Sequence, residues 1–213
     1  MKVSSVIRYR NEEEWIGHAI QSFIDHFPQG EIIAINNNST DSSTDIIRLF
    51  DRFDIKKLDV KDYTPGFVLN LGVQESKNDI VLIQSAHTVI TKIDYNNLQK
   101  NIERYAAVFG NQTPIYLGKR ITKRYVWSHF KENVQIENLF SESENRYFLH
   151  NAFCFYQRNF LLNNKFDEKL HGKEDRYWAA DIVKRGNKYL YDSVNLASNH
   201  YYTKNGATWK GLG

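Results

Sequence analysis

Short apolar runs and amphipathic segments alternate along the first hundred residues of the chain. Four runs rich in Val, Ile or Leu have the length of buried strands, at residues 3–7, 31–35, 55–60 and 80–84. Between them, apolar residues recur at helical spacing, most clearly at residues 12–27, where Trp15, Ile16, Ala19, Ile20 and Phe23 share one face. Further helices are expected at residues 46–53 and after the Pro65–Gly66 turn, as far as residue 76. This alternation predicts an α/β fold with a parallel sheet and right-handed crossovers.

Polar residues follow three of these predicted strands directly. Residues 8–11 come after the first strand, residues 36–41 after the second and residues 84–87 after the fourth. In open α/β sheets, ligands bind outside the carboxyl ends of the strands. We therefore expect these three segments to meet at one crevice.

The second half of the chain has a less regular pattern. Helices are expected at residues 94–105 and 172–186, and extended segments at residues 106–114, 148–157, 188–192 and 194–202. Residues 204–213 are rich in Gly and predict a flexible tail or lid. The pattern is that of one domain over residues 1–203.

Composition narrows the class of protein and of ligand. The 213 residues suffice for one sizeable core, and 28 Lys and Arg against 25 Asp and Glu give a charge of +3, too slight for a nucleic-acid partner. An anionic small molecule is the better expectation. Cys154 is the only cysteine, which excludes an internal disulfide and a CxxC metal site. With no apolar run near the ~20 residues of a spanning helix and a charged start unlike a signal peptide, we expect a cytoplasmic protein, at most resting on a membrane.

Two adjacent carboxylates, Glu174 and Asp175, begin the last predicted helix. The helix dipole and exposed N–H groups favour acidic residues there, which is a purely structural explanation. A general base that projects into the crevice is the functional alternative. Spacing alone favours the structural explanation by about two to one.

The polar segment at residues 36–45 has two explanations as well. Asn, Ser and Thr suit a loop that leads into a helix, and they also suit polar contacts with a base or ribose at a strand end. Neither GxGxxG nor GxxxxGK[ST] occurs, so a dinucleotide fingerprint and a P-loop are excluded.

Histidines and basic residues supply the remaining candidate chemistry. His87 and His200 lie at separate strand-like ends, where imidazoles could bind a transition metal or be purely structural. The cations Lys119, Arg120, Lys123 and Arg124 fit a solvated face better than a contact with phosphates or anionic lipid.

The order of the motifs adds a resemblance to a known family. SSVIRYRNEEEWIGHAIQS, EIIAINNNSTDSSTDII, PGFVLNLGVQESKNDIVLIQSAH and FDEKLHGKEDRYWA together resemble family 2 glycosyltransferases of the GT-A fold, over about residues 3–203. The chain is most similar to a bacterial subgroup with Ser-Ala-His in place of Asp-x-Asp, and FGNQTP and FLHNAFCFYQR resemble blocks of that subgroup. Each motif alone is weak, but their order is specific.

The resemblance implies a fold and an activity. The fold is a single GT-A domain of nucleotide-diphospho-sugar transferase type, Rossmann-like, with a mixed, mainly parallel central sheet flanked by helices. Residues 1–100 would bind the nucleotide-sugar and residues 101–203 the acceptor. The activity is transfer of a sugar from a UDP- or dTDP-sugar to an acceptor hydroxyl with inversion, in bacterial surface polysaccharide synthesis. The acceptor would be an oligosaccharide or lipid-linked, with peripheral contact to the inner membrane or to a partner transferase.

The resemblance also assigns roles to residues. Asp175 would be the general base, supported by Glu174. His87 and His200 would be the ligands of a divalent metal, at about even odds, with manganese preferred over magnesium because imidazoles suit it better. Contacts to the nucleotide-sugar are expected from Arg8, Arg10, Asn11, Glu12, Asn36, Asn38, Asn70, Ser85 and Ala86.

Two alternatives remain open from the sequence. Asn36 stands where relatives commonly have an Asp that binds uracil, and its amide could also suit cytosine, so a CMP- or CDP-activated donor is an alternative. Loss of the acidic metal motif instead suggests a non-catalytic sugar-nucleotide-binding module that assists a partner transferase. Retention of Glu174 and Asp175 argues against that module.

Overall fold

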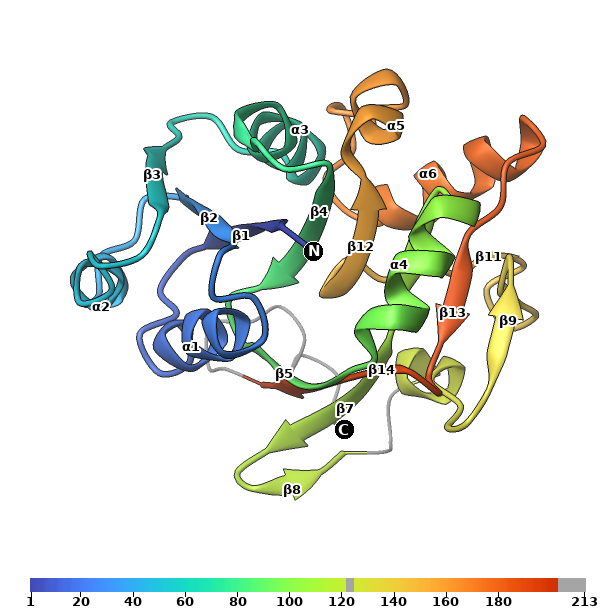
Figure 1. Cartoon of the computed structure of the whole chain (residues 1–213), viewed down its shortest axis with the longest axis horizontal. Helices are drawn as coiled ribbons and strands as arrows, with labels where there is room; N and C mark the ends of the chain where they lie inside the picture. Colours follow the sequence, from blue (N-terminus) through green and yellow to red (C-terminus); the bar gives the residue numbers. More distant parts are fainter. Residues whose placement is uncertain (122–124, 203–213) are drawn as a thin grey trace.

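A computed structural model of the chain describes residues 1–121 and 125–202. A central sheet has the strand order β3-β2-β1-β4-β12-β6-β13-β9 (Figure 1). Its strands are β1 (Val3–Tyr9), β2 (Glu31–Asn36), β3 (Ile55–Asp59), β4 (Ile80–Ser85), β6 (Ala107–Phe109), β9 (Gln135–Glu137), β12 (Phe153–Gln157) and β13 (Leu190–Asp192). The predicted tail at residues 204–213, Thr203, Lys123 and Arg124 lie outside the described residues.

The central sheet is mixed and mainly parallel, as predicted. β1 pairs in parallel with β2 and β4, and β2 with β3. β12 then runs antiparallel to both β4 and β6, and β9 runs antiparallel to β13. The start of β12 therefore lies at the same edge as the carboxyl ends of β1 and β4.

A second, smaller sheet leaves the central one at the end of β4. It has the order β5-β14-β7-β8, formed by β5 (Thr88–Ile93), β7 (Asn111–Tyr116), β8 (Lys119–Arg120) and β14 (Leu196–Tyr201). The chain passes from β4 to β5 through a turn at Ala86 and His87. His200 on β14 is the register partner of Thr88 on β5. The two sheets thus diverge at the Ser-Ala-His segment.

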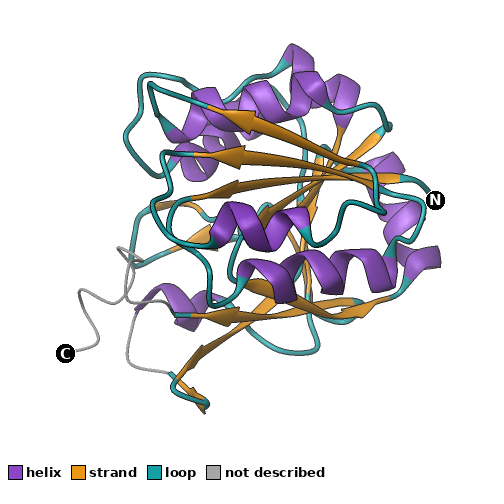
Figure 2. Cartoon of the chain, turned by 90° about the vertical axis from the view of Figure 1, so that its left-hand side faces the viewer, coloured by secondary structure: helices purple, strands orange, loops and turns teal. Residues whose placement is uncertain are grey.

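Helices cover both faces of the central sheet, and the strands alternate their side chains between two apolar clusters (Figures 1 and 2). Val6 and Ile33 face the cluster on the side of α3 (Pro65–Glu75), α5 (Arg158–Asn163) and α6 (Glu174–Lys184). Ile7 and Ala34 face the cluster on the side of α1 (Ile16–His26), α2 (Ser43–Arg48) and α4 (Tyr95–Arg104). A 3-10 helix, η1 (Tyr125–His129), and the hairpin of β10 (Phe140–Ser141) and β11 (Arg146–Tyr147) complete the described structure.

Several element boundaries differ from those expected. α1 begins at Ile16, because Glu12 opens a turn whose carbonyl accepts from the N–H groups of Trp15 and Ile16. α2 begins at Ser43, three residues earlier than expected, and ends at Arg48. The strand expected from residue 148 begins at Phe153, and α5 follows it where no helix was expected. No helix among residues 1–121 and 125–202 is long and apolar enough to cross a membrane.

Candidate active site

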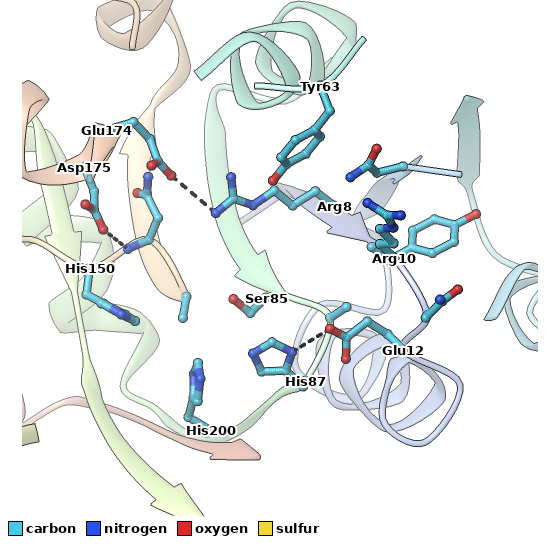
Figure 3. A pocket seen from close by; sticks show the side chains of 16 residues that line it. Arg8, Arg10, Glu12, Tyr63, Ser85, His87, His150, Glu174, Asp175 and His200 are labelled. Atoms are coloured by element: carbon cyan, nitrogen blue, oxygen red, sulfur yellow. Dashed lines mark hydrogen bonds and ion pairs between the residues drawn. The ribbon is translucent and has the colours of Figure 1, made fainter. Parts of the chain in front are cut away.

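A cavity of about 560 Å³ lies where the carboxyl ends of β1, β2 and β4 meet the start of β12 and α6 (Figure 3). The convergence of three strand ends expected from the sequence is therefore present. The lining residues are Arg8, Tyr9, Arg10, Asn11, Glu12, Asn37, Tyr63, Ser85, Ala86, His87, His150, Asn151, Ala152, Glu174, Asp175 and His200. Ten of the expected site residues belong to this set, and Asn36, Asn38 and Asn70 do not.

Glu174 faces Arg8 across the cavity from the first turn of α6 (Figure 3). Its Oε1 lies 3.3 Å from Nη2 of Arg8, so the ion pair joins the end of β1 to α6. Burial raises the pKa of Glu174, and the attraction to Arg8 offsets this rise only in part. Nη1 of Arg8 is shielded from solvent and has no hydrogen-bond partner among the residues that the structure describes.

Asp175 is buried beside Glu174 but has a different set of partners. Its Oδ1 accepts from the backbone N–H of Arg176 at 2.8 Å, and its Oδ2 accepts from that of Asn151 at 3.2 Å. Nη1 of Arg176 donates to both carboxylate oxygens at 2.9 Å. Burial opposes ionisation, but Arg176 and the N–H of Asn151 hold the pKa of Asp175 below its usual value. Asp175 is therefore an ionised carboxylate fixed at the cavity wall.

His87, in the turn between β4 and β5, and His200, on β14, come together at the opposite side of the cavity (Figure 3). Their ring centroids are 4.7 Å apart and the rings are nearly perpendicular. Nδ1 of His87 lies 3.1 Å from Oε1 of Glu12, and Nδ1 of His200 lies 3.3 Å from the hydroxyl of Thr88. Among the described residues, no group of three or more His, Cys, Asp or Glu side chains is arranged to hold a metal ion. The two imidazoles supply at most two nitrogen ligands, so an ion held here would need oxygen ligands from a substrate as well.

Two asparagines expected at the nucleotide site lie elsewhere, with their amides engaged. The Asn70 side chain donates to the carbonyl of Phe166 and to Glu168, each at 2.9 Å, and accepts from the N–H of Phe166 at 3.0 Å. Asn36 donates to Asp59 at 2.8 Å and accepts from the N–H of Ser39 at 2.9 Å. The buried Asn70 thus fastens the loop before α6 to α3, and Asn37, not Asn36, reaches the cavity.

Asn38 also stays outside the cavity lining, and it has a positive φ of 53°. Asn adopts this left-handed conformation more readily than most residues. We conclude that Asn38 shapes the loop between β2 and α2.

The sequence pattern did not single out His150 or Tyr63 as lining residues. Burial, reinforced by Arg176, lowers the pKa of His150 to about 3, so its imidazole is neutral. His150 and Asn151 directly precede β12, whose register places Phe153 opposite Gln84 of β4. If β12 had been predicted to run antiparallel to β4, His150 and Asn151 would have been expected at the edge of the sheet where the cavity lies. The apolar pattern of a strand does not reveal its direction.

Four buried polar atoms around the cavity lack a hydrogen-bond partner within residues 1–121 and 125–202. They are Nη1 of Arg8, Oε2 of Glu12, Nδ1 of His150 and Nδ2 of Asn151. Buried polar groups in proteins are nearly always paired, and unpaired ones at a cavity wall need a ligand or water. Donors and acceptors both occur in this set, so the cavity suits a ligand rich in hydroxyl and phosphate oxygens.

Comparisons with known proteins give sequence relatives of the chain. The family model for "Glycosyl transferase family 2" matches residues 4–170. The "Probable glycosyltransferase YdaM" of Bacillus subtilis (strain 168) is 27% identical over 195 residues, which are 84% of this chain and 44% of that protein. The chain thus spans less than half of this curated relative.

Solved structures share the fold at low sequence identity. TarS 1–349 of S. aureus in complex with UDP-GlcNAc has a TM-score of 0.71 and 18% identity, covering 97% of this chain and 60% of that one. GalNAc-T7 with UDP, GalNAc and Mn²⁺ has a TM-score of 0.69 and 15% identity, covering 97% of this chain and 45% of that one. At these identities the similarity establishes a common fold, which is the GT-A type expected from the motifs.

Proposed function

Because this chain belongs to glycosyl transferase family 2, we propose that it transfers a sugar from a nucleotide-sugar to an acceptor hydroxyl with inversion at the anomeric carbon. The observation that carries the proposal is the buried pair of Glu174 and Asp175 at a cavity with unpaired polar groups. An inverting transfer needs a base on the acceptor side and stabilisation of the departing diphosphate on the other. Asp175 supports the first requirement, and the side of the cavity with His87 and His200 supports the second.

In this mechanism Asp175 accepts the proton of the acceptor hydroxyl. The hydroxyl oxygen then bonds to the anomeric carbon as the bond from that carbon to the diphosphate breaks, and the bonding electrons leave with the nucleoside diphosphate. The contacts from Arg176 and Asn151 fix the direction of the Asp175 carboxylate. Glu174, held by Arg8 at 3.3 Å, would support Asp175 from the neighbouring position.

A divalent metal is part of the proposal, with His87 and His200 as its protein ligands. When bound, the ion would offset the negative charge that develops on the departing diphosphate. Manganese is the better fit, since imidazoles are poor ligands for magnesium. Glu12 would act through His87, because its carboxylate accepts from that imidazole and orients it.

A uridine or deoxythymidine diphosphate is the proposed leaving group. The similarity to TarS, whose solved complex contains UDP-GlcNAc, supports the uridine nucleotide. Tyr9, Arg10, Asn11 and Asn37 also line the cavity, at the ends of β1 and β2, and are the proposed contacts of the nucleoside. Since Asn36 is engaged by Asp59 and Ser39, the argument for a cytidine-activated donor from that residue is weaker.

The proposed acceptor is an oligosaccharide or a lipid-linked sugar of a bacterial surface polysaccharide, reached at the cytoplasmic face of the membrane. The division of labour expected from the sequence, with residues 1–100 for the donor and 101–203 for the acceptor, is also part of the proposal. His150 and Asn151 of the second half lie beside Asp175, where an acceptor hydroxyl must approach.

Calorimetric titration with UDP, dTDP, GDP, CMP and CDP, each with manganese and with a chelator, tests the donor. We expect UDP or dTDP to bind and manganese to tighten the binding. Binding of CMP or CDP but not of UDP or dTDP would instead indicate a cytidine-activated donor. Absence of binding by every nucleotide would contradict the proposed function.

The role of Asp175 is tested with Asp175→Asn. We expect this variant to bind the nucleotide and to lose about 10²–10⁴-fold in nucleotide release from a panel of UDP-sugars. Asp181→Asn is the matched control, since Asp181 lies on the exposed face of the same helix and pairs with Arg185. If the wild-type chain binds nucleotide but never releases it from any donor, the non-catalytic binding module is the correct function.

A further inference from the structure

The hairpin of β7 and β8 carries an apolar residue at its tip in an unfavourable backbone conformation. Leu117 and Gly118 form its two-residue turn, with φ values of 47° and 74°. Such turns favour Asn-Gly, because both residues need a positive φ. Of the seven described non-glycine residues with positive φ, five are Asn, and Leu117 is the only apolar one. Its side chain is 83% exposed, so no packing within the described protein explains the choice of Leu.

Two cations follow this tip directly on β8. Lys119 and Arg120 are both exposed on β8. Arg120 pairs with Glu132 at 3.1 Å, whereas Lys119 makes no ion pair with any described residue. An exposed apolar side chain beside a cation suits the interface of an anionic membrane, where the apolar group enters the lipid and the cation meets phosphates.

The hairpin is tied to the proposed active site through the second sheet. β7 pairs in parallel with β14, and Pro114 is the register partner of His200. Leu117 follows Pro114 by three residues, or roughly 10 Å along an extended strand. In Figure 2 the hairpin is the lowest part of the molecule, and it projects toward the side at which the parallel strands of the central sheet end. The hairpin tip and the strand ends that line the cavity therefore lie toward the same side of the molecule.

We propose that the β7–β8 hairpin docks this protein onto an anionic lipid surface, with Leu117 in the lipid interface and Lys119 on headgroup phosphates. The contact goes beyond the proposed transfer reaction and does not require it. If the acceptor is lipid-linked, which rests on the proposed function, the contact would bring the cavity to the acceptor. One leucine and one lysine give a weak, reversible association.

Co-sedimentation of the full chain with vesicles tests the contact. We expect binding to vesicles of equal parts phosphatidylcholine and phosphatidylglycerol, and little to phosphatidylcholine alone. Leu117→Asn removes the apolar tip while favouring the turn, so it should weaken binding about tenfold without loss of thermal stability. Lys119→Gln should weaken it about fivefold, on the anionic vesicles only.

Leu49→Ser is the matched control, because Leu49 is 82% exposed but follows α2, which lies near β3 at the edge of the central sheet, away from the hairpin (Figure 1). It should leave vesicle binding unchanged. If Leu49→Ser weakened vesicle binding as much as Leu117→Asn, the hairpin would not be the specific site of the contact. The proposal would be overturned if Leu117→Asn bound vesicles as well as the wild type, or if the wild type bound neither kind of vesicle. The exposed Leu117 would then be explained by contact with a protein partner. UDP titration of each variant separates this result from failure of the proposed function.

Discussion

At the scale of single residues, two neighbouring carboxylates have opposite environments. Burial dominates for Glu174 and raises its pKa, whereas Arg176 and backbone N–H groups lower that of Asp175. Adjacent acids with diverging pKa values are a recurrent feature of catalytic sites. Asp175 is therefore the more acidic member of the pair and stays ionised as the pH falls, consistent with the role of base that we propose for it.

Asn70 gives a prediction that separates a structural role from nucleotide binding. Asn70→Ala removes three hydrogen bonds to the loop at residues 166–168 and leaves buried backbone groups of Phe166 unpaired. We expect a loss of about 1–3 kcal/mol in the free energy of unfolding, measured by urea denaturation. Affinity for UDP, measured at a temperature where the variant is folded, should stay at the wild-type value. A large loss of affinity would restore Asn70 to the nucleotide site.

His150 predicts how stability depends on pH. Its pKa is about 3 in the folded protein against about 6.5 in an unfolded chain, so the unfolded state binds the proton first as pH falls. This contribution is complete above about pH 6.5 and is lost between there and pH 3, by at most about 1.4 kcal/mol per pH unit. The slope will be smaller, since the ring borders an open cavity.

His150→Phe tests this dependence because it keeps an aromatic ring and removes the titrating group. Urea denaturation at about pH 7 and about pH 5 should show a smaller loss of stability for the variant than for the wild type. His171→Gln, at an exposed histidine, should keep the wild-type loss. An unchanged loss in His150→Phe would show that other groups cause the acid sensitivity.

The position of a side chain in the fold could be predicted where a strand end located it. Arg8, Ser85 and His87 follow strands with clear apolar runs, so their edge of the sheet could be predicted. His150 was missed because it precedes a strand that runs antiparallel to β4, and the direction of a strand cannot be read from its apolar residues. Asn70 was misplaced because a polar residue on an otherwise apolar helix can serve a loop as well as a ligand.

At the scale of elements, the alternation of strands and helices in residues 1–100 was sufficient to predict a parallel sheet. Helix starts were less predictable, because they depend on turns such as the one that Glu12 opens before α1. The insertion of β12 between β4 and β6 joins segments far apart in the sequence, and no local pattern specifies it. The mixed strand directions of the central sheet could be predicted only from the resemblance to a known family.

The packing of α3 on β1 gives a prediction at this scale. A Cβ on Gly72 would lie 2.3 Å from Cγ1 of Val6, on the strand that carries Arg8. Gly72→Ala should therefore lower the free energy of unfolding by about 1–3 kcal/mol, measured as a lower urea midpoint. Gly172→Ala is the control, since nothing lies within 4 Å of its added Cβ. Equal stability of both variants would mean that α3 can shift freely on the sheet.

At the scale of the whole molecule, the cavity belongs to both halves of the chain. Arg8 and His87 come from the first half, and Asn151, Asp175 and His200 from the second. The Arg8–Glu174 pair and the β4–β12 ladder join these halves directly. A ligand that bridges the cavity should therefore stabilise the entire domain.

Thermal unfolding with UDP and manganese tests this coupling. At about 100 times its Kd a ligand adds about 2.7 kcal/mol, which for a domain of this size raises Tm by about 5–10 °C. Because the sheet is continuous from β3 to β9, we expect one calorimetric transition that moves as a whole. Two transitions, of which UDP moves only one, would mean that residues 1–100 bind the nucleotide as an independent unit. In that case the Arg8–Glu174 pair would not link donor binding in the first half to Asp175 in the second half.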